Sequence, residues 1–298
     1  MFNTPILFLV FNRPEETKIV FEKIRSISPK KLYISSDGPR DGRDDDNINC
    51  IKVKNIVSNI DWECEVFYSF SNENLGCKKA ISNAISWFFS NEEMGIILED
   101  DCLPNTFFFK YCETLLKLYK DNDDISCING NNFIEEKVIS SNYFFSNYNH
   151  CWGWATWKRA WNDFDKGIVF WEKWKLSNEW KILFIDPNER KYWEKIFDKV
   201  FDSKIDSWAY AWTASLWNKS KVSITPPYNL VQNIGFGKNA THTNSSKLSN
   251  FKSNNLQFDL KLRTIKIDYL LDNYLFYKIY YVTIIEKILY KFKKILKY

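Results

Sequence analysis

The first hundred residues alternate short apolar runs with longer segments of helical spacing, and this alternation most constrains the fold. The apolar runs lie at 4–11, 31–35, 65–69 and 95–98. The segments between them, 15–27, about 47–60 and 77–89, repeat apolar residues every three or four positions. Runs that are apolar at consecutive positions are typical of strands buried on both faces. The pattern predicts a β-α-β-α-β-α-β unit, and therefore an α/β fold with a mostly parallel sheet flanked by helices.

The fourth apolar run ends in three consecutive acids, Glu99, Asp100 and Asp101. Carboxylates at the carboxyl end of a buried strand lie at the crevice where open α/β sheets bind ligands. Adjacent acids repel one another, so a nearby cation is needed to keep all three ionised. A divalent metal that also binds a diphosphate would meet that need. The alternative is an acidic turn with solvated side chains.

Composition limits the classes of protein and of partner. The chain has 298 residues, of which 45% are hydrophobic and 18% aromatic, so it can bury a substantial core and line a cleft with rings. Its formal net charge of +4 does not indicate a nucleic-acid partner. The seven cysteines form no CxxC pair, and no signal peptide or bilayer-length apolar run is recognised. We therefore expect reduced thiols and a cytoplasmic protein.

The segment 274–298 differs from the rest of the chain in charge. It carries six lysines and one acid, Glu286, and its apolar residues recur at helical spacing. A basic, aromatic, amphipathic helix could lie on the anionic inner face of the cytoplasmic membrane. Alternatively, the helix packs on its own domain and its lysines are solvated.

Several short motifs together resemble one enzyme family. They occupy 5–13, 36–38, 74–78, 99–101, 152–157, 206–208 and 235–243. In this order they resemble GT-A-fold (Rossmann-like) glycosyltransferases, in particular bacterial surface-polysaccharide transferases distantly similar to animal N-acetylglucosaminyltransferase I. The resemblance implies a nucleotide-sugar-binding half at 1–101 and an acceptor and donor-sugar half at 102–255. The remainder, 256–298, is expected to be a basic, aromatic helical tail.

The resemblance gives roles to the acids. Asp101 would ligate Mn²⁺ or Mg²⁺ on the diphosphate, and Asp100 would lie near the ribose, with Glu99 beside the nucleotide-sugar. A hard cation with carboxylate and phosphate oxygens is chemically apt.

Three residues at or just past strand ends match positions that hold the nucleotide. They are Phe11, Arg13 and Asp37. Asp37 can accept a hydrogen bond from a uracil N–H, and Arg13 suits a phosphate or the base edge. The alternatives are that Arg13 is a surface residue and that Asp37 forms a turn.

The resemblance also implies a catalytic base. Direct displacement at an anomeric carbon requires a carboxylate that takes the proton of the acceptor hydroxyl. Asp206 matches the family's Asp-x-Trp site, although Ser207 stands where the animal enzyme has a second acid. The alternative role for Asp206 is a helix N-cap.

Two further segments are expected to contact the nucleotide-sugar. Trp152, Gly153 and Trp154 resemble the wall of the sugar site, or else they pack in the core. The polar segment 235–255 resembles a lid that closes over the nucleotide-sugar.

Basic side chains complete the predicted site. They are Lys238 and His242 in the lid, which could reach phosphate or metal, and Lys78 and Lys79 at the start of a helix. A helix N-terminus with two lysines could neutralise phosphate oxygens. Otherwise, Lys78 and Lys79 form an ordinary solvated first turn.

These features together predict a metal-dependent, inverting glycosyltransferase that moves a sugar from a UDP-sugar to a glycan or lipid-linked hydroxyl. Bacterial surface polysaccharide or glycoconjugate synthesis is the implied context. One alternative is a sugar-1-phosphate nucleotidyltransferase, which would need a Gly-rich, basic loop after the first strand. The segment Asn12-Arg13-Pro14-Glu15-Glu16 is neither Gly-rich nor strongly basic. The other alternative is a noncatalytic glycan-binding protein.

Overall fold

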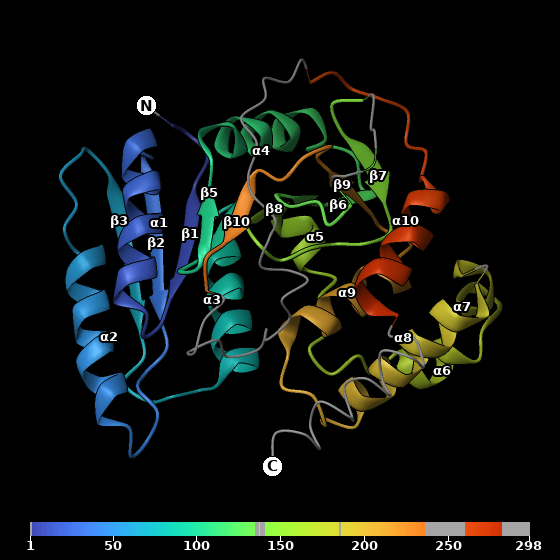
Figure 1. Ribbon diagram of the computed structural model, residues 1–298, viewed down its shortest axis with the longest axis horizontal. Coiled ribbons are helices and arrows are strands. Elements are labelled where there is room, and N and C mark those ends of the chain that lie inside the picture. The colour runs from blue at the N-terminus through green and yellow to red at the C-terminus, as the bar shows by residue number, and fades with distance from the viewer. Residues whose placement is uncertain (1, 135–136, 138–140, 185, 236–259, 282–298) are drawn as a thin grey trace, which may run out of the picture.

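The computed structural model in Figure 1 describes residues 2–134, 137, 141–184, 186–235 and 260–281. These residues form an eight-stranded sheet with helices on both faces. Six of the eight strands run in one direction, since only β7 and β8 pair antiparallel with their neighbours. The predicted α/β class with a mostly parallel sheet is confirmed.

The first hundred residues form the predicted alternation. The elements are β1 (Ile6–Val10), α1 (Pro14–Ile27), β2 (Lys31–Ser36), α2 (Asp44–Val57), β3 (Glu65–Phe70), α3 (Cys77–Asn91) and β4 (Met94–Glu99). Their strands lie in the order β3-β2-β1-β4, and every pair among them is parallel. Parallel strands require crossover helices, and α1, α2 and α3 are these crossovers.

The second half of the chain adds shorter strands and a helical lobe. The elements are β5 (Cys102–Pro104), α4 (Thr106–Leu118), β6 (Ile125–Asn129), β7 (Phe144–Ser146), β8 (Trp154–Trp157), α5 (Lys158–Trp161), α6 (Trp171–Lys175), α7 (Asn178–Leu183), α8 (Pro187–Phe201), α9 (Trp208–Asn218), β9 (Val222–Thr225), β10 (Val231–Asn233), α10 (Tyr269–Leu275) and the π-helical turn η1 (Phe276–Tyr280). Strands β5 and β10 form a separate antiparallel pair.

The two halves of the chain share one sheet. The full strand order is β3-β2-β1-β4-β8-β6-β9-β7, so β8 of the second half pairs directly with β4 of the first. In that antiparallel pair Ile96 faces Ala155. The boundary predicted at residue 101 therefore falls within one hydrogen-bonded sheet.

Strand β1 shows how the core is divided. Its side chains alternate between two hydrophobic clusters: Ile6 and Phe8 pack with α1, α2 and α4, whereas Leu7 and Leu9 pack with α3, α5 and α9. All five residues of β1 are buried. A strand covered on both faces needs apolar side chains at every position, which explains its continuous apolar sequence.

The described part of the tail packs on the protein itself. Leu275 and Phe276 are buried in a third cluster, which is rich in tryptophan and includes α6, α7 and α8. For residues 274–281 the packed-helix alternative is therefore the observed one. The rest of the predicted amphipathic segment, 282–298, lies outside the described residues.

Two sequence expectations concern thiols and membranes. All seven cysteines are free, as predicted. Within the described residues, we find no helix that combines the length and the apolar character needed to cross a bilayer.

Helix α10 is fastened to the sheet by a buried carboxyl group. Asp272 accepts hydrogen bonds from the Ser146 hydroxyl and, at 2.8 Å, from the Asn147 N–H. Burial raises the pKa of Asp272 to about 7, although both hydrogen bonds oppose that shift. The folded protein therefore binds a proton at this group that the unfolded chain releases at lower pH.

We expect this proton to make stability pH-dependent. Because the pKa is raised on folding, its contribution is full below about pH 4 and is lost as the pH rises through about 7. Between these limits the free energy of unfolding of the wild type should fall more steeply than that of Asp272→Asn, by at most about 1.4 kcal/mol per pH unit. Urea denaturation at several pH values measures both slopes. Asp121→Asn, at an 86% exposed side chain remote in sequence from α10, should keep the wild-type slope, and equal slopes in all three proteins would contradict the assignment.

Candidate functional site

The predicted site residues gather where β1, β2 and β4 end and α3 begins. These parallel strands end at the same edge of the sheet, and α3 starts there because it follows β3 (Figure 1). Asp206 reaches this edge from the second half of the chain, since a Cβ placed on Gly76 would lie 3.5 Å from its Oδ2 atom. The sheet thus brings together acids that are about a hundred residues apart in sequence.

Arg13 binds the acids at the end of β4. Its Nη1 atom lies 2.9 Å from Asp100 Oδ1 and 3.0 Å from Asp101 Oδ2. The backbone N–H of Phe11 donates to Asp100 Oδ2 at 3.0 Å. The loop between β1 and α1 therefore supplies both a cation and an amide to the acidic motif. Of the two roles considered for Arg13, the surface alternative does not hold, since its side chain is only 17% exposed.

Burial makes the acidic motif electrostatically unusual. Burial, followed by the charges of Asp101 and Asp100, raises the pKa of Glu99 to about 8. Burial also raises the pKa of Asp100 to about 7, even though Arg13 opposes that rise. A carboxyl group with its pKa near or above neutrality carries a proton for much of the time at neutral pH. The motif therefore holds less negative charge than its three acids suggest, and a further cation nearby would restore that charge.

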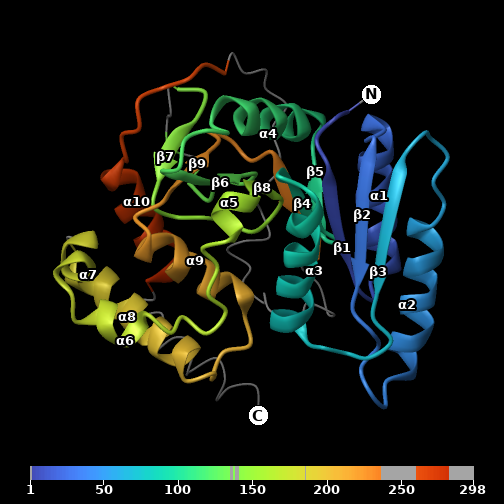
Figure 2. The ribbon, with the colours of Figure 1, turned by 180° about the vertical axis from the view of Figure 1, so that it is seen from behind.

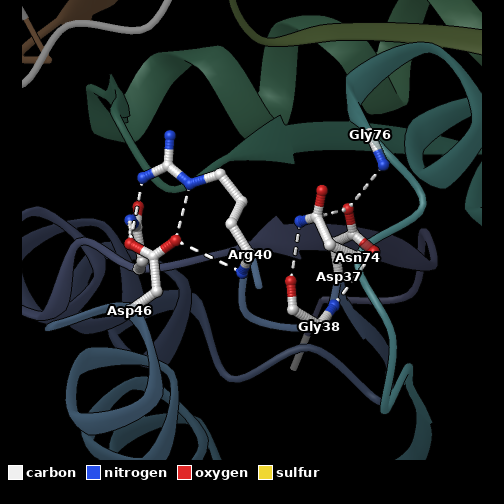
Figure 3. Close-up of polar contacts among 7 residues, drawn as sticks. Asp37, Gly38, Arg40, Asp46, Asn74 and Gly76 are labelled. Atoms are coloured by element: carbon white, nitrogen blue, oxygen red, sulfur yellow. Dashed lines mark hydrogen bonds and ion pairs between the residues drawn. The ribbon is translucent and has the colours of Figure 1, made fainter. Parts of the chain in front are cut away.

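Asp37 fastens two loops together, as Figure 3 shows. Its carboxylate accepts hydrogen bonds from the N–H groups of Gly38 at 2.9 Å, Leu75 at 2.9 Å and Gly76 at 3.1 Å, and from the Asn74 amide at 3.1 Å. This is the turn-forming alternative, extended across the sheet edge to the loop before α3. These contacts fix the start of α3, and a further contact between Asp37 and a uracil N–H stays a prediction.

The Arg40–Asp46 ion pair belongs to the site but was not predicted. Arg40 Nε lies 2.6 Å from Asp46 Oδ2 and Nη2 lies 2.9 Å from Oδ1, a bidentate pair drawn in Figure 3. Asn12 also donates to Asp46 at 2.7 Å, and the Arg40 guanidinium lies 5.6 Å from the centre of the Phe11 ring. The hydrogen bonds from Arg40 are the main cause that lowers the pKa of Asp46 to about 2. The only sequence signal was an arginine shortly before the acidic run 44–46.

The first turn of α3 faces the site. Gly76, at its N-cap, has φ +77°, a left-handed conformation that favours glycine. Lys78 and Lys79 follow in the first turn, Lys78 half-buried and Lys79 exposed. The turn contains no acid, so its N–H groups and its lysines form one positive end.

Asp206 is exposed and lies across the site from the first turn of α3. Ser207, and not Asp206, occupies the N-cap of α9, so the N-cap alternative for Asp206 does not hold. Within the described part of the chain, its carboxylate has no hydrogen bond or ion pair. Asp206 is thus an available carboxylate that faces the start of α3.

The cysteine at the start of α3, Cys77, lies among these charges, which favour its protonated thiol form. Burial is the main cause that raises the pKa of Cys77 to about 12, and the negative charges of Glu99 and Asp206 add to it. A thiol with so high a pKa is protonated at neutral pH, and the thiolate is the nucleophilic form. Covalent catalysis by this cysteine is therefore disfavoured.

The tryptophan motif divides between core and surface. Trp154 is 1% exposed and stacks on Trp208, with ring centres 5.6 Å apart, which is the packing alternative. Trp152 is half-buried and meets the Phe133 ring edge-on at 5.1 Å. Gly153 has φ +62°, and an added Cβ would lie 2.7 Å from the Val231 side chain, so its smallness serves packing against β10. Trp152 is the one residue of the motif left near the surface.

The residues fit a metal only in a limited way. Within the described residues, no group of three or more His, Cys, Asp or Glu side chains is arranged to hold a metal ion. Asp101 could contribute one carboxylate, shared with Arg13, and a diphosphate would supply the other ligands. Gly235 lies against this carboxylate, since an added Cβ would be 2.4 Å from Asp101 Oδ2. The predicted contacts of Lys238 and His242 lie outside the described residues.

Comparison with known proteins gives fold likeness alone. No protein-family model matches the sequence, and the search of curated proteins found no match. Partial likeness is found to HddC from Yersinia pseudotuberculosis, with 12% identity over 42% of this chain and 57% of that chain and a TM-score of 0.28. 4-diphosphocytidyl-2C-methyl-D-erythritol synthase from Anaerococcus prevotii DSM 20548 is 8% identical over 68% of this chain and 84% of that chain, with a TM-score of 0.32. UDP-glucose pyrophosphorylase complexed with UDP-glucose is 12% identical over 50% of this chain and 64% of that chain, with a TM-score of 0.28.

The chain spans less than two thirds of the length of two of these proteins, 57% for HddC and 64% for the pyrophosphorylase. None of the three names is that of a glycosyltransferase. At such low TM-scores the likenesses decide nothing about the activity of this chain.

We expect removal of the Arg13 charge to destabilise the fold. In Arg13→Met the buried Asp100 and the 13% exposed Asp101 lose their cation, and breaking a buried pair costs about 3–5 kcal/mol. Lys204→Met removes an exposed pair with Asp202 and should cost about 0–1 kcal/mol. Urea denaturation at pH 7.5 compares the two variants with the wild type. Equal stability of Arg13→Met and Lys204→Met would show that the acidic motif does not depend on Arg13.

Proposed function

We propose that this chain is a glycosyltransferase that binds a UDP-sugar at the carboxyl ends of β1, β2 and β4, beside the start of α3. The sugar would pass to a hydroxyl of a glycan or lipid-linked glycan, with inversion at the anomeric carbon. One observation carries the proposal: the exposed Asp206 carboxylate faces the first turn of α3 across a site whose other carboxylates are buried or paired. That arrangement gives a base on one wall and an anion-binding element on the other.

The positive end of α3 suits the diphosphate. The N–H groups of its first turn point out of the helix, and Lys78 and Lys79 add two charges, so phosphate oxygens can bind there. When bound, Mn²⁺ or Mg²⁺ would stabilise the charge of the departing diphosphate, with Asp101 as its protein ligand. Phe11 and Arg40 lie beside the ends of β1 and β2, where a ring and a guanidinium can hold the base.

Asp206 is the group proposed to move a proton. A general base must reach the acceptor hydroxyl, and an exposed carboxylate that no described residue binds can do so. Glu99 is a poorer base, because its pKa of about 8 keeps it mostly protonated at neutral pH. Trp152 is half-buried, so its ring can contact the sugar, whereas Trp154 packs in the core against Trp208 of α9.

A sugar-1-phosphate nucleotidyltransferase is the second candidate, the enzymatic alternative that the sequence motifs leave open. UDP-glucose pyrophosphorylase and 4-diphosphocytidyl-2C-methyl-D-erythritol synthase are among the solved structures with partial fold likeness to this chain. Against this candidate, only residues 11–13 separate β1 from α1, and the segment contains no glycine. Such a short loop, bonded to Asp100 through the Phe11 N–H, has little freedom to wrap a triphosphate.

Calorimetry with UDP tests the proposed site first. We expect UDP to bind with Mn²⁺ present and to lose most of its affinity with EDTA or in Asp101→Ala, because the metal would link Asp101 to the diphosphate. Asp121→Ala, at an 86% exposed side chain, is the matched control and should bind as the wild type does. No binding under any condition would favour the noncatalytic glycan-binding alternative.

Product analysis then separates the two enzymatic candidates. A glycosyltransferase releases UDP from a UDP-sugar, whereas a nucleotidyltransferase releases pyrophosphate from UTP and a sugar-1-phosphate. Pyrophosphate release alone would replace the main proposal with the second one.

Replacing the proposed base should affect turnover and not binding. Asp206→Asn keeps the side-chain shape but removes the proton acceptor, so kcat should fall about 10²–10⁴-fold while UDP affinity is unchanged. Steady-state kinetics of UDP release, together with calorimetry, measure both quantities. Asp202→Asn, at another exposed acid before α9, should keep wild-type kcat. An unchanged kcat in Asp206→Asn would remove Asp206 from the mechanism.

A further inference from the structure

The two edge strands of the main sheet, β7 and β3, differ in whether another segment of the chain covers them. At one edge, β7 has three residues and is covered by the chain itself: Phe145 bridges to Ile267, and the Asp268 N–H donates to the Phe145 carbonyl at 3.2 Å. At the other edge, β3 has six residues, and no described segment pairs with its outer side. Figure 2 shows β3 and α2 together at this outermost side of the molecule.

The sequence of β3 lacks the usual protection of an edge strand. Proteins guard exposed edges with lysine, proline, bulges or short strands, because an open edge can pair with another chain. Strand β3 reads Glu-Val-Phe-Tyr-Ser-Phe, with neither lysine nor proline and with its one charge at the first position. Phe67 and Tyr68 are 37% and 43% exposed, and α2 next to β3 carries the exposed Ile48 and Ile51. An open edge with such side chains favours association.

The hydrogen bonds already made by β3 define which of its groups are free. The Glu65 N–H donates to the Lys30 carbonyl at 2.8 Å, and the Ser71 N–H donates to the Ser36 carbonyl at 2.9 Å. In a parallel ladder, alternate residues turn both of their amide groups to the neighbouring strand. Odd-numbered residues of β3 therefore bond to β2, and the N–H and C=O groups of Val66, Tyr68 and Phe70 point outward.

We propose that β3 pairs antiparallel with β3 of a second copy of this chain, around a two-fold axis at Tyr68, to form a continuous sheet. A two-fold axis perpendicular to a sheet places one residue opposite itself. With Tyr68 at the axis, Val66 faces the partner's Phe70, and all three outward-pointing residues lie in hydrogen-bonded pairs. This register uses every free amide group of the strand.

The side chains on both faces suit this register. On the α2 face, Tyr68 meets the partner's Tyr68, and Phe70 meets the partner's Val66; aromatic–aromatic and aromatic–β-branched pairs stabilise antiparallel strands. On the other face, Phe67, which stacks on Tyr33 at 4.5 Å, lies opposite the partner's Ser69. Glu65 lies opposite the partner's Ser71, so no like charges face each other along the paired strands. The second copy of the chain is therefore a self-complementary occupant of this edge.

Sedimentation equilibrium across a dilution series tests the proposal on the full chain. We expect the wild type to show twice the mass of one chain at high concentration, and Tyr68→Lys to stay monomeric, because two lysines would face each other at the axis. Ile182→Lys, which places the same charge on an exposed apolar residue of α7, is the matched control and should remain dimeric. A monomeric wild type, or a Tyr68→Lys protein that is still dimeric, would overturn the proposal.

Amide hydrogen exchange in the wild type gives a readout that does not depend on a variant. In the dimer, the outward N–H groups of Val66, Tyr68 and Phe70 should exchange more slowly as the protein concentration rises. The N–H of Phe67 should be protected at every concentration, since odd-numbered residues of β3 bond to β2. Protection of Val66, Tyr68 and Phe70 that is independent of concentration would also overturn the proposal.

Discussion

The contact of Arg13 with Asp100 and Asp101 is the interaction on which the candidate site depends. Three acids at the end of β4 could not share one buried edge without a cation, because burial already raises the pKa of Asp100 to about 7. The guanidinium, at 2.9 and 3.0 Å from the two carboxylates, supplies that charge from the loop after β1. It therefore joins adjacent parallel strands at their carboxyl ends and sets the shape of the edge.

Two further polar contacts connect the neighbouring loops to one another. Asp37 joins the end of β2 to the turn before α3, and the Arg40–Asp46 pair joins the loop after β2 to Asn12 beside β1. Each contact links segments that follow different strands. This network fixes the first turn of α3 in place, as the proposed anion site would require, because a site works best when its groups are held before the ligand arrives.

The sequence allowed prediction of elements that a local hydrophobic pattern determines, but not of contacts between residues that only the tertiary fold brings together. The strands and helices of the first hundred residues followed from hydrophobic period, since both faces of β1 and β4 are buried. The place of Asp206 opposite α3 could be expected from family resemblance but not from its neighbours in sequence. Trp154 could not be assigned to core or cleft, because alternation does not say which face of β8 is covered by α9. The Arg40–Asp46 pair was missed because its partners lie in a loop and a helix with no periodic signal.

The charge distribution of the site bears on how it would receive a diphosphate. With Glu99 mostly protonated at neutral pH, one guanidinium faces the carboxylates of Asp100 and Asp101, so this wall has no positive charge to spare. A diphosphate placed directly against it would be repelled, whereas the first turn of α3 would attract it. A divalent cation between Asp101 and the diphosphate would remove that repulsion and would also favour the ionised form of Glu99. In the proposed mechanism, Asp206, which is exposed and faces the first turn of α3, is the acid that would accept a proton.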